Sequence, residues 1–300
     1  MDNITERIQQ LKAERNAVIL AHNYQPAEIQ EIADMLGDSL ELSRLAAGVD
    51  AQVIVFCGVT FMAETAAILN PEKTVLLPRL DAGCPMADMI TAPDLLKVRE
   101  QHLGVPIVTY VNTTAAVKAE SDLCCTSANA IKVVESLTDA GTVYMAPDKN
   151  LAQYAARHTD KKVLHWNGFC PIHNNLTADD IAQARAKYPG AKLLAHPECR
   201  PEVLEMADGV FSTSGMLKYV AESSHDAFII ATEVGILHPM AKAAPGKKLY
   251  PASPRMICAD MKKTSLEDVV TSLETLQPRI TVPEETRVRA LAAVERMLAI

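Results

Sequence analysis

The stretch His165-Trp166-Asn167-Gly168-Phe169-Cys170-Pro171-Ile172-His173 carries the only tryptophan of the chain and a Cys-Pro step at the end of a strand-like run. Its cysteine has counterparts elsewhere. Cys84 lies 86 residues before Cys170, and Cys258 lies 88 residues after it. A near-constant interval of that size indicates an internal repeat. These cysteines therefore predict a chain built from three similar segments.

The first segment alternates apolar runs with helical patterns. Ala17–Ala21 is a short apolar run suited to a buried parallel strand, and Val53–Phe56 and Lys73–Leu77 are two more. One helix opens at Pro26 and another lies around Met62, and proline favours the first helical turn. The same order of runs and helices returns from residue 105 and from residue 192. Each segment is therefore predicted to hold three strands with helices between them.

The spacing inside the segments is also similar. The first strand and the cysteine are separated by 66, 63 and 66 residues, counted from Val18, Ile107 and Lys192. A polar residue at the strand end and a following serine are separated by 17, 15 and 18 residues, counted from His22, Asn112 and His196. Agreement in both spacing and element order indicates a threefold repeat.

Strand and helix alternation of this kind predicts an α/β fold with small parallel sheets covered by helices on both faces. We expect three homologous three-layer αβα domains, 1–83, 84–169 and 170–258, related by pseudo-threefold symmetry around a central active site. The tail 259–300 lies outside the repeat. Ser265 and Pro283 each begin a helical pattern there, and we expect both helices to pack back on the first domain.

Composition and charge exclude several classes of function. The 300 residues carry a formal net charge of -8 without the clustered Lys and Arg that nucleic-acid backbones require. The N-terminal residues lack the basic start and apolar core of a secretory signal, and the most apolar window, Val53–Leu69, is too interrupted for a membrane span. Seven cysteines without an export signal suit a reducing compartment. The sequence therefore predicts a cytoplasmic protein that binds neither nucleic acid nor membrane.

Polar side chains gather where the predicted strands end, which is where ligands bind in open parallel sheets. These residues are His22, Tyr24, Tyr110, Asn112, His196 and Glu198. His22 and His196 occupy equivalent positions, and Glu198 is a candidate general acid or base. Hydroxyl residues follow at turns before helices, where they and backbone N–H groups bind phosphate or carboxylate. They are Ser39, Ser127, Thr213 and Ser214, and each taken singly is more often a helix cap than a ligand.

The repeat selects Cys84, Cys170 and Cys258 among the seven cysteines. Three equivalent thiolates at a threefold junction suit an iron–sulfur cube that keeps one iron without a protein ligand, and an open iron can act as a Lewis acid. From these residues alone, zinc ligation and a purely structural role as small buried hydrophobes both stay open. The remaining cysteines have no counterparts in the other segments and are expected in the core: Cys57, Cys124, Cys125 and Cys199.

Three further side chains lie close to these segments. His173 stands three residues after Cys170. It could either support the cysteine ligand from behind or cap the following segment. Lys218 and Arg255 are the cations that fall beside proposed site segments, whereas the other lysines and arginines are expected in solvent.

Eight motifs that follow one another between about residues 18 and 260 together resemble quinolinate synthase. They are Ala21–Gln25, Asp38–Ser39, Ala82–Ala87, Tyr110–Thr113, Cys124–Asn129, Gly168–His173, His196–Cys199 and Ser212–Met216. The match covers nearly the whole repeat region, and its specificity comes from the order of the eight motifs.

The resemblance implies a pseudo-threefold transferase with a 4Fe-4S cluster on Cys84, Cys170 and Cys258 and one open iron. It implies condensation of iminoaspartate with dihydroxyacetone phosphate to quinolinate, with loss of phosphate and water, in the biosynthesis of NAD. An enzyme that supplies iminoaspartate is the implied partner. The catalytic residues implied are Glu198, Tyr24, His22 and His196. The residues implied to surround substrate are His22, Ser39, Tyr110, Asn112, Ser127, His196, Glu198 and Thr213.

One departure and two alternatives accompany this resemblance. Some members carry a Cys-x-x-Cys-x-x-Cys run at the last ligand, whereas Met256–Met261 holds Cys258 alone, which argues against an additional redox disulfide there. A zinc-dependent hydrolase that uses His22, His196 and Glu198 is one alternative interpretation. A non-enzymatic anion-binding module that uses the serines is the other.

Overall fold

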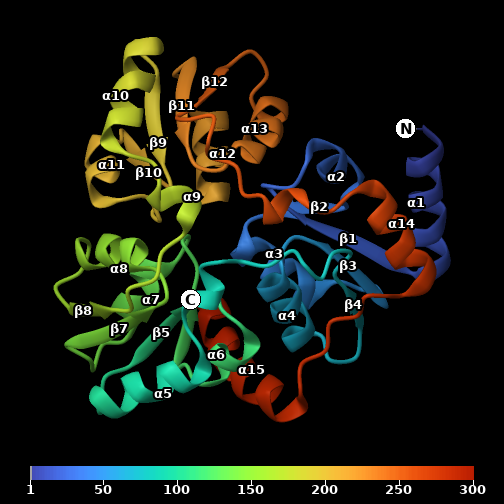
Figure 1. Ribbon diagram of the computed structural model, residues 1–300, viewed down its shortest axis with the longest axis horizontal. Helices are drawn as coiled ribbons and strands as arrows, with labels where there is room; N and C mark the ends of the chain where they lie inside the picture. Colours follow the sequence, from blue (N-terminus) through green and yellow to red (C-terminus); the bar gives the residue numbers. More distant parts are fainter. Residues whose placement is uncertain (1) are drawn as a thin grey trace.

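Three separate four-stranded sheets form the framework of the protein (Figure 1). The computed structural model describes residues 2–300. All strand pairs within the sheets are parallel, and the strand orders are β2-β1-β3-β4, β6-β5-β7-β8 and β10-β9-β11-β12. We call the units around these sheets the first, second and third repeat. Their shared strand order confirms the predicted α/β fold with three small parallel sheets.

The first repeat has central strands that are buried along their length. Its strands are β1 (Ala17–His22), β2 (Met35–Gly37), β3 (Val53–Cys57) and β4 (Thr74–Leu76). Its helices are α1 (Asp2–Arg15), α2 (Ala27–Ile32), α3 (Ser39–Gly48) and α4 (Thr60–Leu69). β3 reads as an unbroken apolar run because helices cover both faces of the sheet.

The second and third repeats follow the same plan. The second holds β5 (Ile107–Tyr110), β6 (Leu123–Cys125), β7 (Thr142–Ala146) and β8 (Lys162–His165), with η1 (Ala87–Met89), α5 (Ala92–Gln101), α6 (Ala115–Ala119), α7 (Ala130–Ser136) and α8 (Lys149–Ala156). The third holds β9 (Lys192–Ala195), β10 (Gly209–Val210), β11 (Ala227–Ala231) and β12 (Lys248–Pro251). Its helices are α9 (Pro171–Asn174), α10 (Ala178–Lys187), α11 (Pro201–Met206), α12 (Thr213–Glu222), η2 (Val234–Ile236), α13 (Leu237–Ala243) and η3 (Asp260–Lys262).

Each sheet has one strand more than the sequence predicted. The additional strands are the edge strands β2, β6 and β10, which are 3, 3 and 2 residues long. Strands this short carry too few residues to show an apolar alternation. They form because they pair along the edge of an already buried first strand.

An aspartate fastens the start of the first strand in every repeat. Asp34, Asp122 and Asp208 accept the backbone N–H of Ile19, Ile107 and Leu193, each at 2.8 Å and each 15 residues away in the chain. Helix caps repeat as well. Thr91, Thr177 and Ser265 each form a capping box, and each stands 7 residues after one of the repeat cysteines. These contacts are independent support for the threefold repeat.

The C-terminal tail does not pack as a pair of helices on the first repeat. α14 (Leu266–Thr275) lies along α1, but α15 (Glu284–Leu298) lies mainly along α6 and β6 of the second repeat and also touches α4. The expectation for α15 was wrong because the buried face of this helix is lined by small residues, Ala290 and Ala293, beside Val294 and Met297. Ala290 packs with alanines of α6, so two helix backbones approach closely there.

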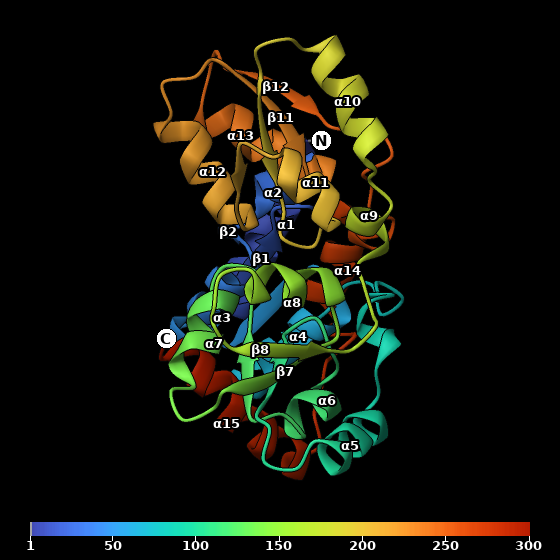
Figure 2. The same cartoon turned by 90° about the vertical axis from the view of Figure 1, so that its left-hand side faces the viewer.

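The three repeats contact one another in a closed ring, and Figure 2 shows the third repeat above the second with the first behind them. Glu31 of α2 meets His238 of α13 at 2.7 Å, joining the first and third repeats. Glu64 of α4 accepts the backbone N–H of Ala115 at 2.8 Å, joining the first and second. Asn150 of α8 donates to the carbonyl of Glu198 at 2.9 Å, joining the second and third. In residues 2–300, no helix has the length and apolar character needed to cross a membrane.

Candidate active site

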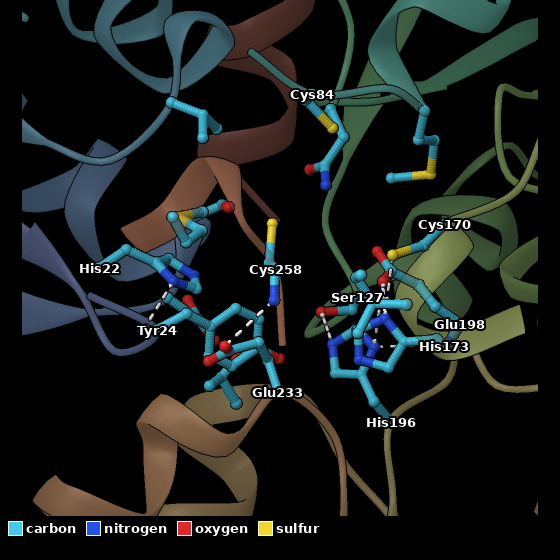
Figure 3. Close-up of a pocket in the computed structure, with 18 of the residues that line it drawn as sticks. His22, Tyr24, Cys84, Ser127, Cys170, His173, His196, Glu198, Glu233 and Cys258 are labelled. Carbon is cyan, nitrogen blue, oxygen red and sulfur yellow. Dashed lines mark hydrogen bonds and ion pairs between the residues drawn. The ribbon is translucent and has the colours of Figure 1, made fainter. Parts of the chain in front are cut away.

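The carboxyl ends of strands from all three repeats face one cavity of about 80 Å³ (Figure 3). Its wall contains every residue that the family resemblance implied as catalytic, substrate-binding or metal-ligating. These are His22, Tyr24, Ser39, Cys84, Tyr110, Asn112, Ser127, Cys170, His196, Glu198, Thr213 and Cys258. The structure therefore brings the whole predicted set together in one place, while the role of each member stays a prediction.

Two equivalent histidines are held by the same local contact. His22 ends β1 and His196 follows β9. The N–H of Tyr24 donates to Nδ1 of His22 at 3.1 Å, and the N–H of Glu198 points to Nδ1 of His196 at 3.4 Å. Because each Nδ1 accepts, the proton of the neutral imidazole lies on Nε2. Both rings thus present an N–H donor rather than a lone pair at the far side of the ring.

Two longer helices also begin at the cavity. Ser39 and Thr213 are the first residues of α3 and α12, and Asp38 and Ser212 cap these helices. Helix N-termini carry unpaired N–H groups and partial positive charge, so they favour anions. Among the described residues, no lysine or arginine lines the cavity. An anionic ligand would therefore be held by hydroxyls, imidazoles and helix ends.

The segment that follows the last strand of each sheet supplies one cysteine to the cavity. Figure 3 shows the sulfurs of Cys84, Cys170 and Cys258 turned toward a shared space. Burial raises the pKa of Cys84 to about 12, and negative charge on Cys258 adds to the effect. Burial likewise raises the pKa of Cys170 and of Cys258. Three bare thiolates are thus unfavourable here, and a cationic group between them would favour their ionised form.

A chain of hydrogen-bonding groups crosses the cavity wall. The hydroxyl of Tyr24 lies 2.5 Å from Oγ1 of Thr232, and Nε2 of His173 lies 2.8 Å from the same oxygen. Nδ1 of His173 lies 2.6 Å from Oε2 of Glu198. All four side chains are buried. Tyr24 and Glu198, which come from different repeats, are therefore connected through two intervening side chains.

The titratable groups along this series of hydrogen bonds differ in their protonation. Burial by itself would raise the pKa of Glu198, but His173 and His196 outweigh it and lower the pKa to about 2. Burial lowers the pKa of His196 to about 3, so this ring is neutral at neutral pH. The low pKa of Glu198 is therefore attributed mainly to its contact with His173. Burial raises the pKa of Tyr24 well above its usual range. Glu198 is therefore a carboxylate and Tyr24 a phenol, a pairing suited to one base and one acid.

Sequence reasoning missed two acidic residues behind the cysteines. Asp148 accepts the backbone N–H of Cys170 at 3.0 Å, and Glu233 accepts that of Cys258 at 3.2 Å. Both stand two residues after the third strand of their repeat. Burial, followed by the charge of Glu198, raises the pKa of Asp148 to about 8. Their matching position after β7 and β11 is the feature that could have revealed them.

Thr232, the residue that directly follows β11, was also not named by the sequence analysis. His173, for which two roles were open, contacts Cys170, Glu198 and Thr232. It therefore lies behind the cysteine as part of the site.

Several other candidates lie away from the cavity. Lys218 is exposed, and Arg255 reaches outward to Asp180 at 2.6 Å. Ser214 hydrogen bonds to Glu41 instead of lining the wall. The four cysteines without counterparts are buried and do not line the cavity: Cys57, Cys124, Cys125 and Cys199.

Comparison with known proteins agrees with this geometry. A family model described as "Quinolinate synthetase A protein" matches residues 6–299. The chain belongs to this family. It is 58% identical over 297 residues to the quinolinate synthase of Methanoregula boonei, covering 99% of this chain and 98% of that protein. It is 54% identical over 299 residues to the quinolinate synthase of Geotalea uraniireducens, with 100% and 98% covered.

A further member of the family, quinolinate synthase 1 of Methanosarcina acetivorans, is 54% identical over 298 residues, covering 99% of this chain and 98% of that protein. Similarity therefore extends over all three repeats and the tail. The three parallel sheets are consistent with membership of this family.

Proposed function

We propose that this protein is a quinolinate synthase that condenses iminoaspartate with dihydroxyacetone phosphate and releases phosphate and water. The observation that carries the proposal is the cavity itself. It brings three cysteine thiols together with an ionised carboxylate and a protonated phenol, in a chain that matches the family from residue 6 to 299.

The donor set of the three cysteines fits an iron–sulfur cluster. In the part of the chain that the structure describes, the sulfurs of Cys84, Cys170 and Cys258 do not all lie within 4.8 Å of one another. A cube takes its thiolates at separate corners and so needs a wider spacing than a single ion. We assign these cysteines as its ligands. When bound, such a cluster supplies an iron without a protein ligand, which acts as a Lewis acid.

The wall residues suit two anionic substrates. Carboxylate and phosphate groups accept hydrogen bonds, and Tyr110, the Nε2 atoms of the histidines and the starts of α3 and α12 supply donors. Burial raises the pKa of Tyr110 well above its usual range, so its hydroxyl stays protonated. Asn112 and Ser127 add polar groups on the second repeat's side. Substrate orientation is therefore assigned to hydrogen bonds and not to lysine or arginine.

Proton transfer is assigned to Glu198 and Tyr24. The carboxylate of Glu198 accepts protons during imine formation and isomerisation, and the phenol of Tyr24 donates them. Thr232 and His173 connect the two groups through contacts of 2.5, 2.8 and 2.6 Å. The proton taken up on one side of the cavity can thus be returned on the other without entry of bulk water.

A supplying enzyme follows from the substrate chemistry. An imine hydrolyses in water, so iminoaspartate has to be delivered soon after it forms. We assign the partner to the class of enzymes that oxidise an amino acid to its imine.

The test is purification without oxygen, followed by an assay of quinolinate formation and by measurement of iron and acid-labile sulfide. We expect brown protein with iron and sulfide in equal amounts and quinolinate formed from both substrates together. Colourless protein that contains zinc and hydrolyses other substrates would instead support the hydrolase interpretation. Anion binding that survives removal of all three cysteines, without turnover, would support a binding module.

A further inference from the structure

Cys170, His173 and Glu198 form a smaller group of potential ligands inside the cavity. Sγ of Cys170 lies 3.2 Å from Nδ1 of His173, and Oε2 of Glu198 lies 2.6 Å from the same nitrogen. The three donor atoms lie within 4.8 Å of one another, and no other group of three such side chains in residues 3–300 meets this spacing. Thiolate, imidazole and carboxylate are the three ligand types that zinc takes in proteins.

We propose that the protein without an iron–sulfur cluster binds one Zn²⁺ ion through Cys170, His173 and Glu198, with a fourth position open to the cavity. Bonds form from the ion to Sγ, Nδ1 and one carboxylate oxygen. The thiol proton leaves to solvent, and the imidazole proton moves from Nδ1 to Nε2, which then donates to Oγ1 of Thr232. A set of thiolate, imidazole and carboxylate ligands with one open position is typical of zinc sites.

The group needs only a small adjustment to close around an ion. Zinc bonds of about 2.0–2.3 Å in a tetrahedron separate the ligand atoms by roughly 3.3–3.6 Å. The pair Cys170 and His173 is already close to this spacing at 3.2 Å. The carboxylate of Glu198 has to withdraw from Nδ1 by about 0.8 Å, which a rotation of its side chain provides.

Neighbouring side chains already hold the ligands in orientation. A histidine that binds a metal commonly engages its second ring nitrogen in a hydrogen bond, and Nε2 of His173 lies 2.8 Å from Oγ1 of Thr232. Asp148 accepts the N–H of Cys170 at 3.0 Å and fixes the start of α9. Nδ1 of His196 lies 3.6 Å from Oε2 of Glu198.

Zinc at this place and a cluster would exclude each other. Both need the thiolate of Cys170, so a chain that holds zinc cannot accept a cluster at Cys84, Cys170 and Cys258. This consequence rests on the proposed function, whereas zinc binding by the cluster-free protein does not.

The first experiment titrates the reduced, full-length, cluster-free protein with Zn²⁺ in competition with a coloured chelator, and then with Co²⁺. We expect one ion per chain. The Co²⁺ form should show the absorption of a tetrahedral site and a sulfur-to-cobalt charge-transfer band with the intensity of one thiolate. A band with the intensity of three thiolates would place the ion among the three cysteines and overturn the proposal.

Variants locate the ion independently. We expect Cys170→Ala, His173→Ala and Glu198→Gln each to weaken Zn²⁺ binding about 100-fold or more, since even changes to groups behind a ligand cost 10–100-fold. Cys84→Ala and Cys258→Ala are the matched controls and should bind as the wild type does. Equal losses in these controls, or unchanged binding in His173→Ala and Glu198→Gln, would refute the assignment. The circular dichroism of each variant checks its fold, and the wild-type cobalt spectrum decides the question without any variant.

The exclusion of the cluster is measured separately. Cluster-free protein loaded with Zn²⁺ should fail to gain iron–sulfur absorbance during reconstitution with iron and sulfide until a chelator removes the zinc. Zinc binding with undisturbed reconstitution would refute the shared use of Cys170. Zinc binding in a protein that never takes up a cluster would instead count against the proposed function.

Discussion

Thr232→Val tests the chain of hydrogen bonds that joins Tyr24 to Glu198. Valine keeps the branched shape of threonine and removes only the hydroxyl. That hydroxyl lies 2.5 Å from the phenol of Tyr24 and 2.8 Å from Nε2 of His173. Thr232 is 1% exposed and does not line the cavity. The substitution therefore interrupts the chain without changing a surface that substrate touches.

The expected size of the effect follows from the two contacts. A buried polar group without a partner costs about 1–3 kcal/mol, and Nε2 of His173 loses its only hydrogen bond. We expect the free energy of unfolding to fall by that amount. Positioned acid–base groups contribute 10²–10⁴-fold to rates, so we expect kcat to fall about 100-fold. KM for both substrates should change little, because the substitution removes no contact with bound substrate.

The assay is anaerobic quinolinate formation at saturating substrate, with iron and sulfide measured on the same preparation. Thr232→Ser keeps a hydroxyl in place and is the matched control, and its kcat should recover most of the loss. A Thr232→Val enzyme with a full cluster and a kcat within about threefold of the wild type would refute a role for this chain in turnover.

Three further predictions concern other groups of the candidate site. Cys170→Ala should lose cluster absorbance and activity together; a fully active, colourless variant would contradict the assigned ligands. Glu198→Gln should keep the cluster and lose turnover by roughly 10²–10⁴-fold, and near-normal turnover would remove this carboxylate from the mechanism. Asp148→Asn should stabilise the protein increasingly as pH rises. The folded pKa of Asp148 is raised to about 8, so the native state holds a proton that the unfolded chain releases above about 4, and wild-type stability falls between these values. The melting temperature of Asp148→Asn minus that of the wild type should therefore grow between pH 5 and pH 8, and a constant difference would contradict the raised pKa.

Much of the fold could be predicted because each central strand is buried on both faces. Such strands read as unbroken apolar runs, as Val53–Phe56 does, and their order repeats at a measurable interval. The wall of the cavity followed from the rule that ligands meet the carboxyl ends of parallel strands. Edge strands such as Gly209–Val210 left no comparable pattern, because two residues cannot show a period.

The remaining features depend on how the repeats dock. Thr232 contacts both Tyr24 and His173, which belong to other parts of the chain, so nothing in its local sequence distinguishes it. α15 buries alanines that a search for large apolar residues passes over, while Val288 on the same helix is 51% exposed. Asp148 and Glu233 are different residue types at equivalent positions, and their shared contact with a cysteine appears only in three dimensions.

The ring of contacts among the repeats also limits how this architecture can grow. In an open solenoid, each added unit stacks on the last, and the end units need special capping sequences. Here the third repeat meets the first through His238 and Glu31, so neither is terminal. A fourth unit would have to break that junction and would move the existing strand ends away from one another. The number of units is thus fixed at three by the need to converge on one point.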